Sequence, residues 1–253
     1  MAKTKKVLFL VPYPLQTAPS QRFRVELFLP ELKTAGIQYS IEPFLDKRTG
    51  KVLYQKGNFF LKAFGLLKGF VRRWWVLFFK LPFYDYVFIH REAAPVGPPV
   101  FEWIIIKLFG KKVIYDFDDA IWIPNSSSAN HLVNWFKAFW KVKYICKWSY
   151  KITPGNDYLY DYARQFNQQV IRIPTCINVD VQQQKVKRSH NGKLSIGWTG
   201  SHSTLKYLDQ IIPAVGALQQ DFDFHFLVIA DKKPVLNLKD WQFIPCRPRC
   251  ARR

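Results

Sequence analysis

The chain has 253 residues, enough for one large domain or two modest ones, and its 49% apolar residues exclude a wholly disordered protein. It carries 38 Lys and Arg against 18 Asp and Glu, a formal charge of +20, and 17% of its residues are aromatic. This balance favours anionic partners, whether nucleic acid, acidic lipid or phosphorylated substrates, and charge alone does not choose among them.

The four cysteines do not indicate a metal site. Cys246 and Cys250 would supply only two ligands, and no cysteine lies near a histidine cluster. We therefore predict no metal and no resident cofactor.

The N-terminus resembles a signal peptide in its basic start and apolar run. However, Pro12 interrupts that run directly after Val7–Val11, and no clear cleavage site follows. We interpret the run as a first buried strand and expect a cytoplasmic, reduced protein.

Apolar runs alternate with helical patterns along the chain, which predicts an α/β fold with Rossmann-like parallel sheets. The first helix is predicted over Gln21–Ala35, capped by Ser20 and ended by Gly36. Asn156 or Asp157 would cap a later helix. The other predicted strands are Tyr86–His90, Lys112–Tyr115, Tyr150–Thr153, Val170–Ile173, Leu194–Trp198 and Phe224–Ile229, and the other predicted helices are Pro98–Phe109, His131–Trp148 and Asn156–Phe166.

A polar stretch that contains QQQKVKRSHNG separates the two sets of strands. It has almost nothing to bury, so it predicts a linker over residues 181–192 between an N-terminal domain, 1–180, and an incomplete second Rossmann-like domain, 193–253.

In open parallel sheets, ligands bind beyond the carboxyl ends of the strands. After the first strand, PYPLQTAPSQRFR lacks the GxGxxG pattern of dinucleotide-binding proteins, which argues against an NAD-dependent enzyme. Arg22 and Arg24 fall in the first helical turn, where they would either contact an anion or lie in solvent.

Two later strand ends carry charged side chains. His90 follows YDYVFI and is either structural or catalytic. In YDFDDAIW, the carboxylates of Asp116, Asp118 and Asp119 crowd one strand end, where they would repel one another unless compensated. This crowding favours a functional role.

The stretch KLSIGWTGSHST joins an apolar run to a helical pattern. Gly197 and Gly200 permit tight backbone conformations, and Ser201, Ser203 and Thr204 offer hydroxyls beside a helix start. This arrangement predicts a cradle for a diphosphate.

Together these motifs resemble the retaining glycosyltransferases of GT-B architecture, specifically family 4 (glycosyl transferases group 1). The matching text is PSQRFRVELFLPELKTAGI, YDFDDAIW, ITPGNDYLYDYARQFNQQVIRIPTCINVD and IGWTGSHSTLKYLDQIIPAVGAL. The resemblance covers most of residues 5–240, and the order of the motifs is more specific than any one of them.

The resemblance implies transfer of a sugar from a nucleotide-sugar, as co-substrate, to an acceptor held by the N-terminal domain. Gly200 and Ser201 would contact the donor diphosphate, with Thr204 capping the helix behind them. Asp118 or Asp119 would stand where many relatives place a catalytic-site histidine after this strand, and would orient the acceptor or a sugar hydroxyl. The loop that carries Ser20, Arg22 and Arg24 would border the acceptor cleft.

The sequence departs from this family at its end. Members continue through a basic pair that neutralises the leaving diphosphate and a Glu-x7-Glu segment, whereas this chain reads CRPRCARR after DWQFIP. We expect a truncated second domain and impaired activity, because the leaving-group charge would lack its cations.

Residues 58–83 form the most unusual segment of the first domain. At about 100° per residue, its five cations fall in one arc, opposite a face that includes Phe60, Phe64, Leu67 and Trp74. This pattern predicts either a core helix or an interfacial helix on anionic lipid, and a nucleic-acid patch is a third alternative. The predicted membrane contacts are Lys68, Arg72, Arg73 and Trp74.

The leading hypothesis is a glycosyltransferase that builds a cell-surface glycan or modifies a lipid-linked acceptor. The alternative is a catalytically inactive, membrane-associated or anion-binding fragment. We expect no nucleic-acid partner and a cytoplasmic location, either free or peripheral on the cytoplasmic face of the membrane.

Overall fold

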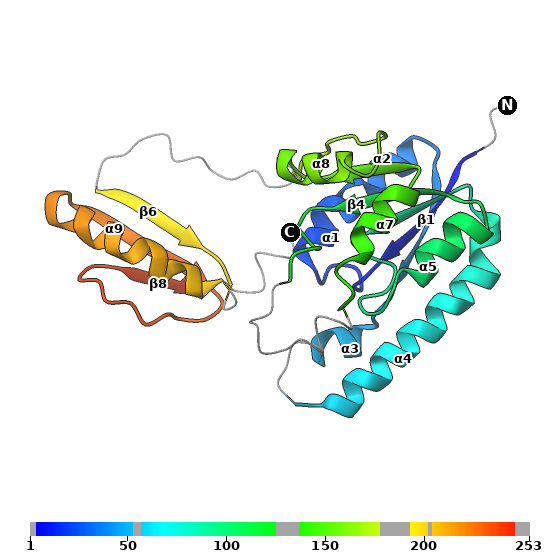
Figure 1. Cartoon of the computed structure of the whole chain (residues 1–253). Helices are drawn as coiled ribbons and strands as arrows, with labels where there is room; N and C mark the ends of the chain where they lie inside the picture. Colours follow the sequence, from blue (N-terminus) through cyan, green and yellow to red (C-terminus); the bar gives the residue numbers. More distant parts are fainter. Residues whose placement is uncertain (1–3, 53–56, 125–136, 178–192, 202–203, 246–253) are drawn as a thin grey trace. The chain divides into compact units, whose positions relative to one another are not determined.

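The computed structural model describes residues 4–52, 57–124, 137–177, 193–201 and 204–245 (Figure 1). The chain divides into two compact units, Met1–Ile177 and Asn178–Arg253, each with its own sheet. Both sheets are parallel throughout, which confirms the predicted α/β class. The predicted linker, 181–192, lies outside the described residues.

The first unit is built on a five-stranded sheet with the order β2-β1-β3-β4-β5. The predicted strand over Val170–Ile173 is not formed as a strand of the sheet. Val170 makes an isolated parallel bridge to Ile152, and the N–H groups of Ile171 and Ile173 donate to the carbonyls of Ile152 and Pro154 on β5. Strand β2 was not predicted, because the predicted strands were continuous apolar runs and its sequence, QYSIEP, alternates polar and apolar residues. The strands are β1 (Lys6–Val11), β2 (Gln38–Pro43), β3 (Tyr86–His90), β4 (Lys112–Phe117) and β5 (Lys151–Pro154).

The segment after β1 is not the single helix that its pattern predicts. It forms α1 (Pro19–Arg24), a 3₁₀ turn and α2 (Leu29–Thr34). Pro30 explains the break, because proline has no N–H and its ring clashes with the carbonyl four residues earlier. Ser20 does not cap this segment: it lies inside α1, whose N-cap is Ala18. Gly36, at φ +70°, ends α2 as predicted.

The remaining helices follow the predicted order. Asn156 caps α8 (Asp157–Arg164), because its side-chain oxygen accepts a 2.9 Å hydrogen bond from the Leu159 N–H. The first part of the predicted helix over 131–148 lies outside the described residues, and its end forms α7. The other elements are α3 (Lys47–Val52), α5 (Val100–Trp103), the π-helix η4 (Ile104–Leu108) and α7 (Lys141–Trp148).

Each face of the sheet has its own hydrophobic cluster. Leu8 and Leu10 of β1 point into the larger cluster, which takes in side chains from the helices after β2, β3 and β4. Their neighbours in β1, Phe9 and Val11, point to the opposite face and pack under α1 and α2. This alternation places α4, α5 and α7 in one layer (Figure 1).

Helix α4 (Phe59–Trp75) continues as the π-helix η2 (Val76–Lys80) and a 3₁₀ turn, η3 (Leu81–Phe83). Its buried line consists of Gly65, Gly69 and Arg73, four residues apart, and Leu77 of η2 extends it. An added Cβ at Gly69 would lie 2.4 Å from the Phe44 ring, so only glycine allows this approach. The helix therefore packs on the core, but not through the apolar stripe, so the prediction that this stripe faces the sheet is wrong.

Arg73 is a core residue and not a membrane contact. Only 1% of it is exposed, and it donates hydrogen bonds to the carbonyls of Ala93, Glu42 and Val11. Burial lowers its pKa to about 10, so the guanidinium keeps its charge at neutral pH.

The second unit contains a three-stranded sheet with the order β6-β7-β8, packed against α9 (Leu208–Asp221). Leu208 and Val215 of α9 share a small core with Phe224, Phe226 and Val228. The short strand β8 was not predicted. The strands are β6 (Leu194–Thr199), β7 (Phe224–Ala230) and β8 (Gln242–Pro245).

Gly69→Ala should destabilise the first unit, although alanine is normally the better helix former. We expect a loss of about 1–3 kcal/mol from overpacking against Phe44, measured by urea unfolding. Gly216→Ala is the matched control, because its Cβ would meet only Leu238, at 3.6 Å. An equal effect of both substitutions would contradict the close-packing explanation.

Candidate active site

The candidate site lies where β3, β4 and β5 end. His90 is the last residue of β3 and pairs in register with Asp116, which pairs in turn with Thr153 on β5. These side chains meet because parallel strands bring their carboxyl ends to one edge of the sheet.

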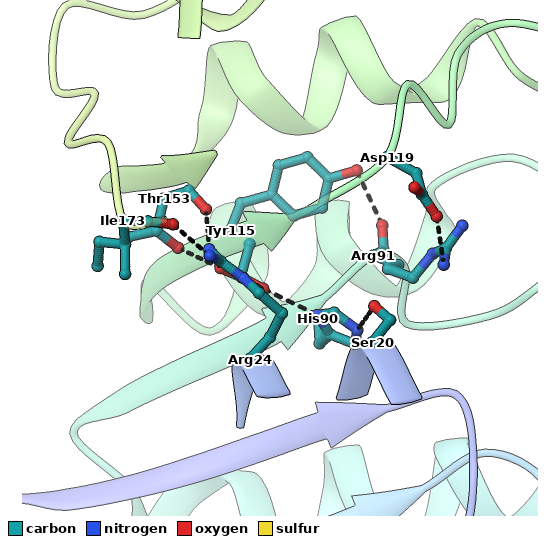
Figure 2. Close-up of polar contacts among 9 residues, drawn as sticks. Ser20, Arg24, His90, Arg91, Tyr115, Asp119, Thr153 and Ile173 are labelled. Carbon is teal, nitrogen blue, oxygen red and sulfur yellow. Dashed lines mark hydrogen bonds and ion pairs between the residues drawn. The ribbon is translucent and has the colours of Figure 1, made fainter. Parts of the chain in front are cut away.

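Asp116, His90 and Ser20 form a hydrogen-bonded chain (Figure 2). His90 Nδ1 lies 2.8 Å from Asp116 Oδ2, and Ser20 Oγ lies 3.1 Å from His90 Nε2. His90 and Asp116 are buried, whereas Ser20 is half-buried. The chain therefore runs from the interior to an accessible hydroxyl.

Arg24 is the counter-ion of Asp116 and not a residue of the acceptor surface. Its guanidinium forms a buried ion pair with the Asp116 carboxylate and donates to the carbonyls of Thr153 and Ile173. Thr153 Oγ1 donates a further 2.8 Å bond to the same carboxylate. The acceptor-side prediction for Arg24 is thus corrected, because its side chain is buried and its head group is bound to Asp116 and two carbonyls. Arg22 is half-exposed, with its guanidinium 4.9 Å from the Phe23 ring centroid.

The other two carboxylates after β4 differ in their surroundings. Asp119 is exposed and pairs with Arg91 at 3.0 Å, while the Arg91 carbonyl accepts from Tyr115 (Figure 2). Asp118 Oδ1 is buried and has no hydrogen-bond partner among the described residues. The expected mutual repulsion is avoided because two of the three carboxylates have cationic partners. Asp118 is the carboxylate without a described cationic partner.

A pocket of about 490 Å³ opens beside this chain. Ser20 and His90 are among its lining residues. Ser20 is half-buried, whereas the His90 side chain is fully buried and its Nε2 is covered by the Ser20 hydroxyl. Lys47 and Arg91 add positive charge to a lining that is otherwise mainly apolar. The remaining lining residues are Tyr13, Pro14, Thr17, Ala18, Pro19, Gln21 and Gly50.

Two larger hollows, of about 910 and 580 Å³, lie at the opposite edge of the sheet and share Lys6 and Tyr84. They border the starts of the strands, far from the His90–Asp116 pair in the topology. Parallel sheets carry their ligands at the carboxyl edge, so we assign the site to the smaller pocket.

In the predicted diphosphate cradle of the second unit, the backbone N–H groups of Gly200 and Ser201 are bound to other groups of the protein. The Gly200 N–H donates to the Ile229 carbonyl at 3.1 Å, and the Ser201 N–H donates to Thr204 Oγ1 at 2.9 Å. Thr204 therefore closes the turn and does not cap the helix behind it. Ser203 lies outside the described residues. An added Cβ at Gly200 would lie 2.3 Å from the Trp198 ring, so packing alone requires this glycine, whereas Gly197 has open space.

The described residues contain no group of three or more His, Cys, Asp or Glu side chains that could hold a metal ion. Of the cysteines, Cys146 is buried, and burial raises its thiol pKa to about 12. Cys246 and Cys250 lie outside the described residues.

Comparisons with known proteins give distant likenesses only. No protein-family model matches the chain, and no curated protein sequence does. Among solved structures, the calicheamicin glycosyltransferase CalG4 is 11% identical with a TM-score of 0.41, over 98% of this chain and 71% of that one. The spinosyn forosaminyltransferase SpnP is 11% identical with a TM-score of 0.42, over 97% of this chain and 70% of that one. Because both scores are below 0.5, the functional assignment rests on the residues of the site.

Arg24→Gln should unfold the first unit more readily, because it leaves the Asp116 charge buried without its counter-ion. Breaking a buried pair from one side costs about 3–5 kcal/mol, which urea unfolding would measure. Asp119→Asn, which breaks the exposed pair with Arg91, should cost at most about 1 kcal/mol. Equal losses from the two substitutions would show that the buried pair has no special role.

Proposed function

We propose that this protein transfers a sugar from a nucleotide-sugar to a hydroxyl group of an acceptor that binds in the Ser20–His90 pocket. The observation that carries the proposal is the chain from Asp116 through His90 to that pocket, with 2.8 Å between His90 Nδ1 and Asp116 Oδ2. Such a chain prepares an imidazole to take a proton from a bound hydroxyl.

The partners of Asp116 define what His90 can do. Arg24 and Thr153 both donate to this carboxylate, so it can only accept from His90. Nδ1 must therefore carry the proton, and in the neutral ring Nε2 keeps its lone pair. That nitrogen faces Ser20 at 3.1 Å. Because the His90 side chain is fully buried, an acceptor hydroxyl would have to displace Ser20 to reach this nitrogen. It would lose its proton there as its oxygen bonds the anomeric carbon of the sugar and the bond from that carbon to the nucleoside diphosphate breaks.

The charge of the pocket suits an acceptor that carries phosphate. Lys47 and Arg91 line it, and Asp119 is the only carboxylate in contact with either among the described ion pairs. The apolar part of the lining would contact the hydrocarbon next to such a phosphate. We therefore favour a lipid-linked acceptor on the route to a cell-surface glycan over a neutral free sugar.

The donor remains assigned to the second unit by the resemblance of its IGWTGSHST segment to the family 4 motif. Because the amides of Gly200 and Ser201 are engaged within the turn, a diphosphate would have to exchange with those partners or use the Ser201 hydroxyl. Asp118, with its unmatched oxygen, is a candidate to hold a sugar hydroxyl. The same resemblance implies a retaining mechanism, whereas removal of the acceptor proton by His90 fits a single displacement that inverts the anomeric carbon, so the anomeric configuration of the product distinguishes the two.

The same geometry supports a second candidate function, acyl hydrolysis. A serine hydroxyl, an imidazole and a carboxylate in this order form the arrangement that activates a serine nucleophile. In that case Ser20 would itself attack the substrate. In sugar transfer it would only hydrogen-bond to His90 Nε2 until an acceptor hydroxyl displaces it.

The proposal is tested by incubating the protein with UDP-, GDP- and dTDP-sugars and polyprenyl-phosphate-linked sugars as acceptors, and measuring nucleoside diphosphate release. His90→Gln should lower the rate by about 10²–10⁴ without changing the Kd for the donor, because only proton transfer is lost. His225→Gln, on the exposed side of β7, is the matched control and should have no effect.

Ser20→Ala separates the two functions. It should lower sugar transfer by less than about 10-fold but abolish ester hydrolysis and labelling by a fluorophosphonate. An unchanged transfer rate in His90→Gln would reject the proposal. Saturable nucleotide binding without turnover for any donor would instead favour the catalytically inactive, anion-binding alternative.

A further inference from the structure

The apolar stripe of α4 points away from the core. Its side chains repeat every three or four residues, and about 100° per residue places them roughly 180° from Gly69 and Arg73 on the buried side. Their exposed fractions are 87% for Phe60, 67% for Phe64, 60% for Leu67, 62% for Val71, 37% for Trp74 and 54% for Phe78.

The stripe does not end at α4. The Trp74 and Phe78 rings contact Phe101 of α5, which is buried, and Phe109 beyond η4, which is half-buried, at 5.1 and 6.3 Å, and the exposed Trp103 and Leu108 belong to the same segment. Beyond these contacts an apolar hollow of about 270 Å³ lies between α5 and α7. Its walls are Pro98, Pro99, Val100, Trp103, Trp140, Tyr144 and Trp148. The outward sides of α4, α5 and α7 thus form one aromatic surface, the α4–α5–α7 face.

This face is almost free of negative charge. Segments 58–83, 98–112 and 137–151 together contain thirteen Lys or Arg and one carboxylate, Glu102. Glu102 is buried and accepts a hydrogen bond from the Ala93 N–H. Glu102 is therefore not presented on the surface of these segments.

The cations of the face fall into two groups. Lys68 pairs with Asp46 at 2.9 Å, and Arg72 and Lys80 both pair with Glu42, whose pKa they lower although burial opposes this. In contrast, three exposed lysines of η4 and α7 have no carboxylate partner among the described residues: Lys107, Lys143 and Lys147.

We propose that the α4–α5–α7 face docks on an anionic lipid bilayer, with its aromatic side chains at the acyl boundary and Lys107, Lys143 and Lys147 at the headgroups. None of the described helices is long and apolar enough to cross a membrane, and docking requires none. A second copy of the chain is a poor occupant, because it would bring like-charged lysines face to face. Anionic headgroups match both the rings and the unpaired cations.

The experiment is co-sedimentation of the full chain with vesicles of phosphatidylcholine alone or mixed with phosphatidylglycerol. Lys107→Gln/Lys143→Gln/Lys147→Gln should weaken binding to the acidic vesicles about 100-fold. The matched control, Lys232→Gln/Lys233→Gln/Lys239→Gln, removes the same charge from exposed lysines of the second unit and should not weaken it. Lys68→Gln/Arg72→Gln should have less effect, because carboxylates already neutralise those cations.

The apolar contribution is tested with Phe64→Ser/Val71→Ser, both on the outward side of α4 and so compatible with folding. This variant should lose the binding that persists in 1 M salt, where the Debye length is about 3 Å. Phe222→Ser, an exposed ring in the second unit, is its control. Binding to vesicles requires neither the sugar donor nor the acceptor, so this test is independent of sugar transfer.

Three results would overturn the proposal. One is equal recovery on neutral and acidic vesicles, and another is equal weakening by the two lysine triples. The third is a dimer in sedimentation velocity that Phe64→Ser/Val71→Ser dissociates, because the face would then bind a second copy.

Discussion

A single buried carboxylate, that of Asp116, determines how the site of the first unit is built. A charge removed from water must be compensated by close partners, or it costs several kcal/mol. Asp116 obtains them from three separate parts of the chain: Arg24 on α1, Thr153 on β5 and His90 on β3. Because these partners cannot move without leaving the charge unpaired, the orientation of His90 toward the pocket follows from the stability of the fold.

A second buried charge has the same effect on the other face of the sheet. Arg73 satisfies three carbonyls, those of Val11, Glu42 and Ala93, and therefore must point inward. Gly65 and Gly69, on the same line of α4, let the helix approach closely enough for the arginine to reach them. Once this line is fixed as the packing face, the helical repeat forces the large apolar side chains outward. The exposed stripe is thus a consequence of burying a cation.

Strand positions and the α/β class could be predicted, because continuous apolar runs are a property of the local sequence. His90 and the carboxylates after β4 could also be located, since strand ends are visible in the pattern. Local sequence does not show which residues of neighbouring strands lie side by side. Asp116, and not Asp118 or Asp119, faces His90 because of the register between β3 and β4, and these two residues are 26 positions apart in the sequence. The orientation of α4 was predicted wrongly for a related reason. The buried arginine turns the helix so that its apolar side chains face outward, whereas apolar faces ordinarily pack inward.

Helix α3 contacts both the pocket and helix α4. Lys47 and Gly50 of α3 line the pocket, while Thr49 packs against Gly65 of α4. Gly65 is on the buried side of α4, so α3 and α4 both lie between the pocket and the surface proposed to meet lipid. An acceptor held in a bilayer by its lipid would have to extend past both helices to reach His90. The two proposals still support the same choice of acceptor, since a soluble glycan would gain nothing from an aromatic surface that docks on lipid.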